Sequence, residues 1–156
     1  MSLLSELKVD FVITKGTVSE SLLADSLSNP ALPQFVTGSI TGPIGVAASQ
    51  DFKDSEGNQL KVPDNALPIL AKISGTTTFV GSSLMLRLVD GDHTGFYNAF
   101  GTLSAAEINT GALLNLNNSP IVQKVNVGYN ILEARMLVNA MPAGDVVHVT
   151  LGYLIQ

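Results

Sequence analysis

The chain has 156 residues, which suits a single domain with its own core and leaves little room for a second. Only 13% of the residues are charged and the net charge is −5, so the sequence lacks the Lys and Arg density that nucleic acid or an anionic membrane surface requires. It has no cysteine for disulfides or thiolate metal sites, no long apolar run and no signal-peptide pattern, and we expect a soluble chain without export.

The N-terminal third combines one strand pattern with segments of ambiguous structure. Residues 9–14 alternate apolar and polar side chains, which predicts a strand. Residues 15–35 fit either a helical turn or a loose arm. Residues 35–48 are rich in Gly, Thr and β-branched residues, which is typical of short strands or of an extended arm that crosses a neighbouring subunit. Residues 49–59 are acidic and rich in turn formers, and we expect an exposed loop there.

From residue 62 onward the alternation becomes more regular. After the turn at residues 63–65, one face of a strand would carry Leu67, Ile69, Ala71 and Ile73. Proline cannot donate a backbone hydrogen bond, so Pro68 on the opposite face indicates either an edge strand or a bulge.

The next segments predict a strand and the single helix that we expect. Residues 84–89 place three leucines on one side, as in a half-buried strand. Ser104 and Glu107 have the Ser-x-x-Glu spacing of a capping box, which predicts a short helix that ends near Gly111.

The C-terminal part contains three further strand candidates. Residues 121–127 and 131–140 flank a turn-forming triplet that fits a hairpin. Residues 131–140 suit either helix or strand, and we favour strand because the segment is short and lies between two turns. The last segment, residues 146–155, alternates strictly and carries its apolar side chains on one face.

Seven to nine short strands separated by polar turns, with one short helix, predict an all-β fold. We expect an antiparallel β-sandwich of the jelly-roll type with an extended N-terminal segment. Residues 1–61 would form a strand and an arm that packs on the main body or on a neighbour, and residues 62–156 would form the sandwich core. The whole chain would be one domain.

A metal site is the first chemical candidate in the sequence. Asp90, Asp92, Thr94 and Gly95 occupy the first, third, fifth and sixth positions of an EF-hand-type calcium loop. The twelfth position, which needs a bidentate Glu, is Gly101. We therefore read residues 90–95 as an acidic turn and keep Asp90, Asp92 and Thr94 as weak metal candidates only.

The sequence supports a catalytic site less well than it supports the calcium-loop pattern. A histidine metal centre would require His93 and His148 to converge with Asp90 or Asp92, and a solvated loop histidine is the commoner situation. No carboxylate pair and no nucleophile motif stands out. We expect neither a cofactor nor an enzymatic activity. The paired-carboxylate candidates are Asp51, Asp54, Glu56, Asp90, Asp92, Glu107, Glu133 and Asp145.

Three aromatic residues, Phe96, Tyr97 and Phe100, follow the acidic turn. They fit a sugar-stacking platform of a lectin-like module, but tryptophan, the best stacking residue, is absent from the chain. Packing in the core or at an interface is the favoured interpretation of this cluster.

The segment from Val62 to Ile155 resembles small structural proteins from the virions of tailed bacteriophages. The resemblance lies in "VPDNALPILAKISGTTTFVGSSLMLRLVDGD", "TLSAAEINTGALLNL" and "MPAGDVVHVTLGYLIQ". It implies a sandwich subunit that serves as an auxiliary, decoration or cement protein on the phage head, assembled in the host cytoplasm. It also implies binding to the major capsid protein and a homotrimeric state.

A sparsely charged chain suits such a role, since charges buried at an interface must be paired. Strand edges and the N-terminal segment are the expected contact regions. The alternative function is a carbohydrate- or receptor-binding sandwich in a fibre, tail or surface component, with Tyr97 as its platform. The contact residues that we nominate for the virion role are Leu3, Leu4, Leu7, Phe35, Val36 and Ile40.

Overall fold

A computed structural model describes residues 32–63, 66–93, 96–116 and 131–155 of the chain. The chain divides into two compact units, Met1–Leu32 and Pro33–Gln156, and every strand of the described residues belongs to the second unit. The strand predicted for residues 9–14 and the one predicted for residues 121–127 lie outside the described residues. So do most of residues 15–35.

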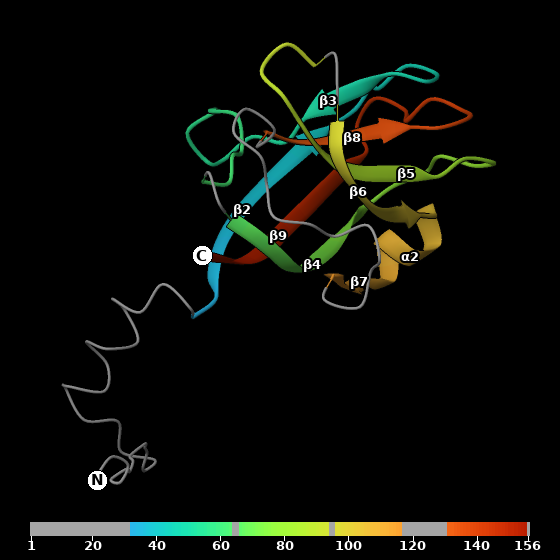
Figure 1. Cartoon of the computed structure of the whole chain (residues 1–156). Coiled ribbons are helices and arrows are strands. Elements are labelled where there is room, and N and C mark those ends of the chain that lie inside the picture. The colour runs from blue at the N-terminus through green and yellow to red at the C-terminus, as the bar shows by residue number, and fades with distance from the viewer. Residues whose placement is uncertain (1–31, 64–65, 94–95, 117–130, 156) are drawn as a thin grey trace, which may run out of the picture. The chain divides into compact units, whose positions relative to one another are not determined.

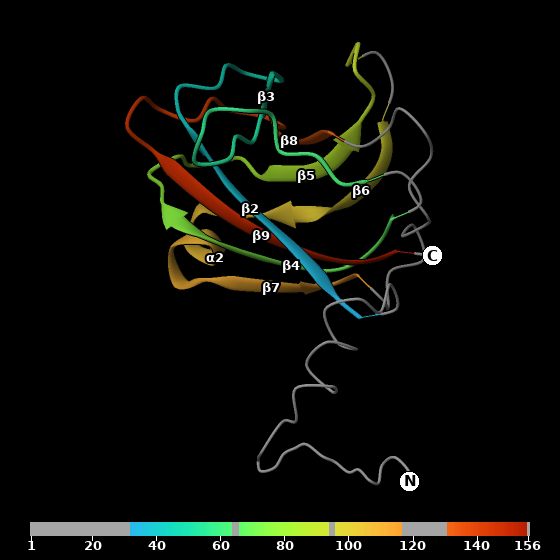
Figure 2. The same cartoon turned by 90° about the vertical axis from the view of Figure 1, so that its left-hand side faces the viewer.

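Pro33–Gln156 is built from two four-stranded sheets that lie face to face (Figures 1 and 2). One sheet has the order β2-β9-β4-β7 and the other the order β3-β8-β5-β6. A single helix, α2, follows β6 within the described residues. The elements in chain order are β2 (Gln34–Thr41), β3 (Ser49–Asp51), β4 (Ala66–Thr76), β5 (Leu84–Val89), β6 (Phe96–Leu103), α2 (Ala105–Thr110), β7 (Ala112–Asn115), β8 (Ile131–Met136) and β9 (Val146–Ile155).

The strand pairing is nested. The first of these strands pairs with the last, β2 with β9, and then β3 with β8, β4 with β7 and β5 with β6, all antiparallel. A long hairpin whose two arms are rolled into two facing sheets has this pairing, which defines a jelly roll. The predicted all-β, antiparallel jelly-roll sandwich is therefore confirmed.

Alternating side chains from both sheets form the core. In β9 the residues Val147, Val149, Leu151 and Tyr153 are buried, as the alternation predicted. Residues 131–136 form strand β8 and not a helix, and Leu132 points into the same core. Each sheet therefore has an inner apolar face and an outer face that carries the remaining residues.

The helix is held by the predicted capping box. The hydroxyl of Ser104 accepts a hydrogen bond from the backbone N–H of Glu107, and the Glu107 carboxylate accepts one from the backbone N–H of Ser104. Ile108 is fully buried and fixes the helix on the core. The residue that follows the helix, Gly111, ends it with φ at 89°, a conformation that favours glycine.

A bulge in strand β4 changes which of its side chains face the core. The register shifts between Pro68 and Leu70, so the bulge was the correct alternative, and β4 is an interior strand between β9 and β7. Because a bulge reverses the alternation, Ala66 points into the core while Leu67 is only partly buried. The prediction that Leu67 shares one face with Ile69, Ala71 and Ile73 was therefore wrong.

Three strands were not predicted. Residues 49–59 are not simply an exposed loop, because they contain β3 and the fully buried Phe52. Strand β6 lacks a simple alternation, because the register of its pairing with β5 shifts twice. Strand β7 has four residues, too few for a periodic signal. Strands β2 and β3 both pair with strands from the C-terminal part of the chain.

Candidate functional site

A row of three charged residues crosses the outer face of the sheet β3-β8-β5-β6. Asp51 in β3 lies directly opposite Glu133 in β8, and Glu133 lies directly opposite Arg87 in β5. Residues on either side of Glu133 point into the core, so all three charged side chains occupy the opposite face. We call Asp51, Glu133 and Arg87 the charged row.

Glu133 is the most unusual member of the charged row. Its side chain is 1% exposed, and its Oε2 accepts a hydrogen bond of 2.5 Å from Nε of Arg87. Its other oxygen, Oε1, is buried and has no hydrogen-bond partner among the residues that the structure describes. A second carboxylate, Asp51, stands across from it, and like charges directly opposite in a sheet repel each other. Arg87 therefore compensates the charge of one of the two carboxylates.

His93 joins the charged row from the turn that follows β5. Its Nε2 lies 2.8 Å from Oδ1 and 3.0 Å from Oδ2 of Asp51. The side-chain amide of Gln59 donates a hydrogen bond of 2.8 Å to Oδ2 of the same carboxylate. The backbone N–H of His93 donates to the carbonyl of Asp90, and φ of His93 is 59°, in the left-handed region.

This setting changes the acid–base behaviour of His93. The hydrogen bond to Asp51 raises the pKa of His93 above its ordinary value of 6.5, and desolvation opposes that effect. The negative charges of Asp51, Glu133 and Asp90 also raise the pKa. His93 is thus stabilised in its charged form.

The structure gathers a different set of residues from the one that the sequence suggested. Asp92 is exposed in the turn, and Thr94 lies outside the described residues, so the calcium-loop interpretation gains no assembled ligand set. His148 lies in β9 of the opposite sheet and does not join His93. Ligand atoms of Asp51, His93 and Glu133 instead lie within 4.8 Å of one another.

Asp51 and Glu133 are not recognisable as a pair in the sequence because they lie 82 positions apart along the chain. One signal was available, since Glu133 sits at an outward position within the apolar alternation of residues 131–136. Its partner required knowledge of the β3–β8 register.

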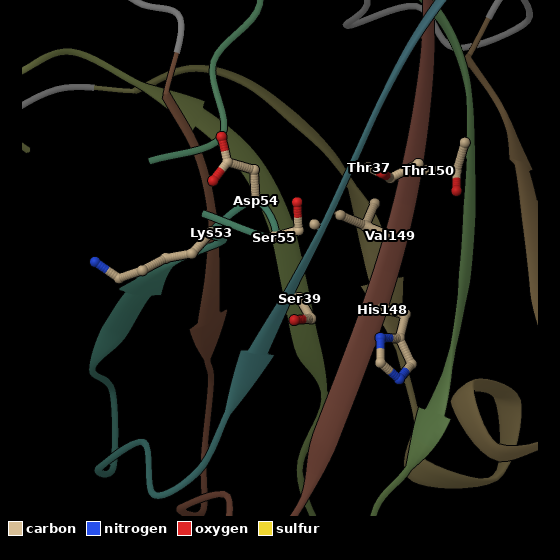
Figure 3. A pocket seen from close by; sticks show the side chains of 9 residues that line it. Thr37, Ser39, Lys53, Asp54, Ser55, His148, Val149 and Thr150 are labelled. Atoms are coloured by element: carbon tan, nitrogen blue, oxygen red, sulfur yellow. The ribbon is translucent and has the colours of Figure 1, made fainter. Parts of the chain in front are cut away.

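His148 contributes to a polar groove on the outer face of the other sheet, with a volume of about 270 Å³. Figure 3 shows Ser39 of β2 and His148 of β9 beside each other on neighbouring strands, as their direct pairing requires. Asp54 and Ser55 line the groove from the segment after β3. Four hydroxyl side chains, one imidazole and the charged side chains of Lys53 and Asp54 are among the groups that line this groove.

The same outer face carries an apolar area near the start of β2. Phe35 is 57% exposed, and its ring lies over Gly152 beside the side chain of Leu70. Leu67 and Leu154 are directly paired on this face and only partly buried. We call Phe35, Leu67, Leu70 and Leu154 the outer apolar patch.

The nominated contact residues fall into three groups. Leu3, Leu4 and Leu7 lie outside the described residues. Phe35 is exposed, and Val36 is partly buried against the core. Ile40 is 2% exposed and belongs to the core, so its side chain is not available to a partner.

Three loops lie together at the end of the sandwich where β2 ends and β9 begins. Thr41 and Thr76 both pair with Val146, which places the loops at 42–48, 77–83 and 137–145 at one end. Each of these loops carries an exposed valine, and Val80 is 78% exposed. The three residues, which we call the valine end, are Val46, Val80 and Val138.

Hydrogen bonds tie these loops to one another. The carboxylate of Asp145 accepts hydrogen bonds of 2.8 Å from the backbone N–H and from the hydroxyl of Thr78. The side-chain amide of Asn139 donates to the carbonyls of Val80 and Gly81. These side chains link loops 77–83 and 137–145, and backbone hydrogen bonds between Ile44 and Met141 link loop 42–48 to loop 137–145. The valines are therefore presented on a cross-linked framework.

Similarity to known proteins is visible only at the level of structure. No protein-family model matches the sequence, and no curated protein matches it. The fold is similar to a chain in the capsid of Ralstonia phage GP4, with a TM-score of 0.55, 12% identity and coverage of 80% of this chain and 84% of that one. A chain of the cyanophage Pam1 capsid asymmetric unit gives a TM-score of 0.50 at 16% identity, with coverage of 80% and 85%.

These matches establish the shared jelly-roll fold. In the described part of the chain, no helix is long and apolar enough to cross a membrane.

Proposed function

We propose that the chain is a structural protein of a phage virion, and specifically an auxiliary or decoration subunit that binds the major capsid protein. The observation that carries this proposal is the nested strand pairing, which builds a jelly roll similar to chains in two phage capsids. Jelly rolls are a common architecture of viral capsid domains. A structural role also agrees with the absence of a nucleophile motif from the sequence.

The surface supports a role in assembly. Large exposed apolar patches mark interaction sites, and this chain exposes Phe35 within the outer apolar patch and three valines at the valine end. The low charge content reduces the desolvation cost of covering such surfaces. In the proposal the outer apolar patch contacts the capsid shell, and Leu3, Leu4 and Leu7 add contacts from the N-terminal segment.

The test uses particles of the encoding phage that were assembled without this chain. Purified chain should sediment with these particles at a saturable stoichiometry. Phe35→Ser should weaken the binding, whereas Lys72→Ser, which changes an exposed residue on the same sheet face, should not. Equal binding by both variants would show that the outer apolar patch does not contact the capsid. Absence of binding by the wild-type chain would refute the decoration role.

The oligomeric state is a separate part of the proposal. Closed symmetry is the usual state of structural subunits, and we propose a homotrimer. Native mass spectrometry of the isolated chain at micromolar concentration should show a species of three times the chain mass. A monomer that nevertheless binds particles would refute the trimer and leave the decoration role intact.

The polar groove favours carbohydrate binding as a second candidate function. Jelly rolls also occur in lectins, and hydroxyl groups of Thr37, Ser39 and Thr150 line the groove together with Lys53. Glycan-array binding that is lost in Ser39→Val would support this function. The Tyr97 platform is tested in parallel by Tyr97→Ala, because the side chain of Tyr97 lies outside the described residues.

A further inference from the structure

Within the charged row two carboxylates stand against one arginine, and His93 supplies a second positive charge only when its imidazole is protonated. Two carboxylates, Asp51 and Glu133, face each other across adjacent strands, and Glu133 is buried with one oxygen that has no hydrogen-bond partner in the described part of the chain. A buried, unpaired carboxylate oxygen costs free energy, and native structures rarely keep one without a use. Arg87 binds only the other oxygen of Glu133.

We propose that Asp51, His93 and Glu133 bind a divalent transition-metal ion, with Zn²⁺ as the best fit. One imidazole nitrogen and one oxygen from each of two carboxylates form a mixed N/O ligand set that zinc accepts, with water in the fourth position. The large, oxygen-only shells that Ca²⁺ and Mg²⁺ prefer do not match a set that contains an imidazole.

The geometry suits an ion after small movements. The three ligand atoms lie within 4.8 Å of one another, whereas ligand atoms on tetrahedral zinc stand roughly 3.3–3.6 Å apart because each bond is about 2.0–2.2 Å. His93 and Asp51 are partly solvent-accessible, at 38% and 15% of their side chains, so both can turn. Glu133 is fixed, and its Oε1 is the one buried side-chain atom without a hydrogen bond among the described residues.

The neighbouring groups already orient the carboxylates as the outer partners of a metal site do. Gln59 holds Oδ2 of Asp51, and Arg87 holds Oε2 of Glu133. Each carboxylate therefore has one oxygen bound by a group outside the proposed ligand set, and the other oxygen of Asp51 contacts only His93, which is itself a proposed ligand, among the described residues. An ion would also join the turn that follows β5 to strands β3 and β8.

The experiment uses the full chain, freed of any purification tag and stripped of metal with EDTA. Titration calorimetry with ZnCl₂ at about pH 7.5 should show one ion per chain. His93→Gln and Asp51→Asn should each weaken the binding by about tenfold or more. His93 is exposed, so His93→Gln tests the site without endangering the core, and a circular dichroism spectrum checks the fold.

Two variants serve as matched controls. Asp92→Asn removes an exposed carboxylate from the same turn, and His148→Gln removes the other histidine of the chain. Both should bind zinc as the wild type does. Cobalt should give visible absorption bands in the wild type and in both controls, and His93→Gln should lack them.

Two results would overturn the proposal. One is a wild-type chain that binds less than one zinc ion at saturation. The other is equal affinity of His93→Gln and the wild type. The site does not depend on the proposed capsid role, so failure of particle binding leaves it unaffected.

Discussion

Asp145 provides a direct test of how the valine end is held. This residue is buried, and its carboxylate accepts two hydrogen bonds of 2.8 Å from the backbone N–H and the hydroxyl of Thr78. A hydrogen bond to a charged group contributes about 1.5–3 kcal/mol. Thr78 is exposed, so water replaces part of what is lost, and Asp145→Ala should lower the free energy of unfolding by about 3 kcal/mol.

Asp145→Asn should cost much less. The amide oxygen accepts from the Thr78 N–H, and the amide nitrogen donates to the Thr78 hydroxyl oxygen, so only the charge assistance is lost, about 1 kcal/mol. For a chain of this size, 1 kcal/mol lowers the melting temperature by about 3–4 °C. We therefore expect decreases of roughly 10 °C for Asp145→Ala and roughly 4 °C for Asp145→Asn.

Thermal melts followed by circular dichroism, with urea titrations as a second measurement, are the assay. Asp92→Asn is the control, since it removes an exposed carboxylate and should leave the melting temperature unchanged. Equal destabilisation by the alanine and asparagine substitutions, or a loss of less than about 1 kcal/mol in Asp145→Ala, would refute the reasoning.

Three further predictions concern the charged row and the helix. Arg87→Met leaves Glu133 buried without its cation and should lower the free energy of unfolding in urea by about 3–5 kcal/mol. The double variant Arg87→Met with Glu133→Leu should recover most of that loss, because neither charge of the buried pair remains. A single variant as stable as the wild type would contradict this. Ser104→Ala removes the N-cap side chain of α2 and should lower the free energy of unfolding by about 1 kcal/mol. Ser104→Asp should retain most of the stability, because aspartate also caps helices. Equal losses in the two variants would count against the capping role. In the metal-free chain, NMR titration should place the pKa of His93 above 6.5, and Asp51→Asn should lower it. Because the pKa of His93 is raised in the folded chain, the stabilisation from the His93–Asp51 pair is fully present below the unfolded pKa of 6.5 and is lost as pH rises through the folded pKa. The wild type should therefore exceed His93→Gln in stability by more at low pH than at high pH. The groups that face His93 are Asp51 of β3, Glu133 of β8 and Asp90 of its own turn, and a difference that grows with pH would show that this assignment is wrong.

Much of the sandwich was predictable because alternation is a local signal. Val147, Val149 and Leu151 in β9 and the leucines of β5 fell on the faces that the period of two dictates. The capping box at Ser104 was equally local and equally reliable. These elements can be predicted without knowing which strands they pair with.

The structural features that the sequence did not predict all depend on how the strands pair. Strand β3 has three polar or charged residues and exists because it pairs with β8. Leu67 was assigned to the wrong face because the bulge after Pro68 adds a residue that no alternation rule anticipates. The pairing of Asp51 with Glu133 likewise follows from the β3–β8 register, and sequence spacing carries no trace of it.

Binding to the phage particle tests most directly the proposed role of this jelly roll as a virion subunit. Particles assembled without the chain are mixed with the purified wild-type protein, separated by sedimentation and examined by cryo-electron microscopy. We expect saturable binding and added density at symmetry-related positions on the shell, into which the two-sheet body fits. Chain that stays in the supernatant at concentrations far above that of the capsid subunits would contradict the claim.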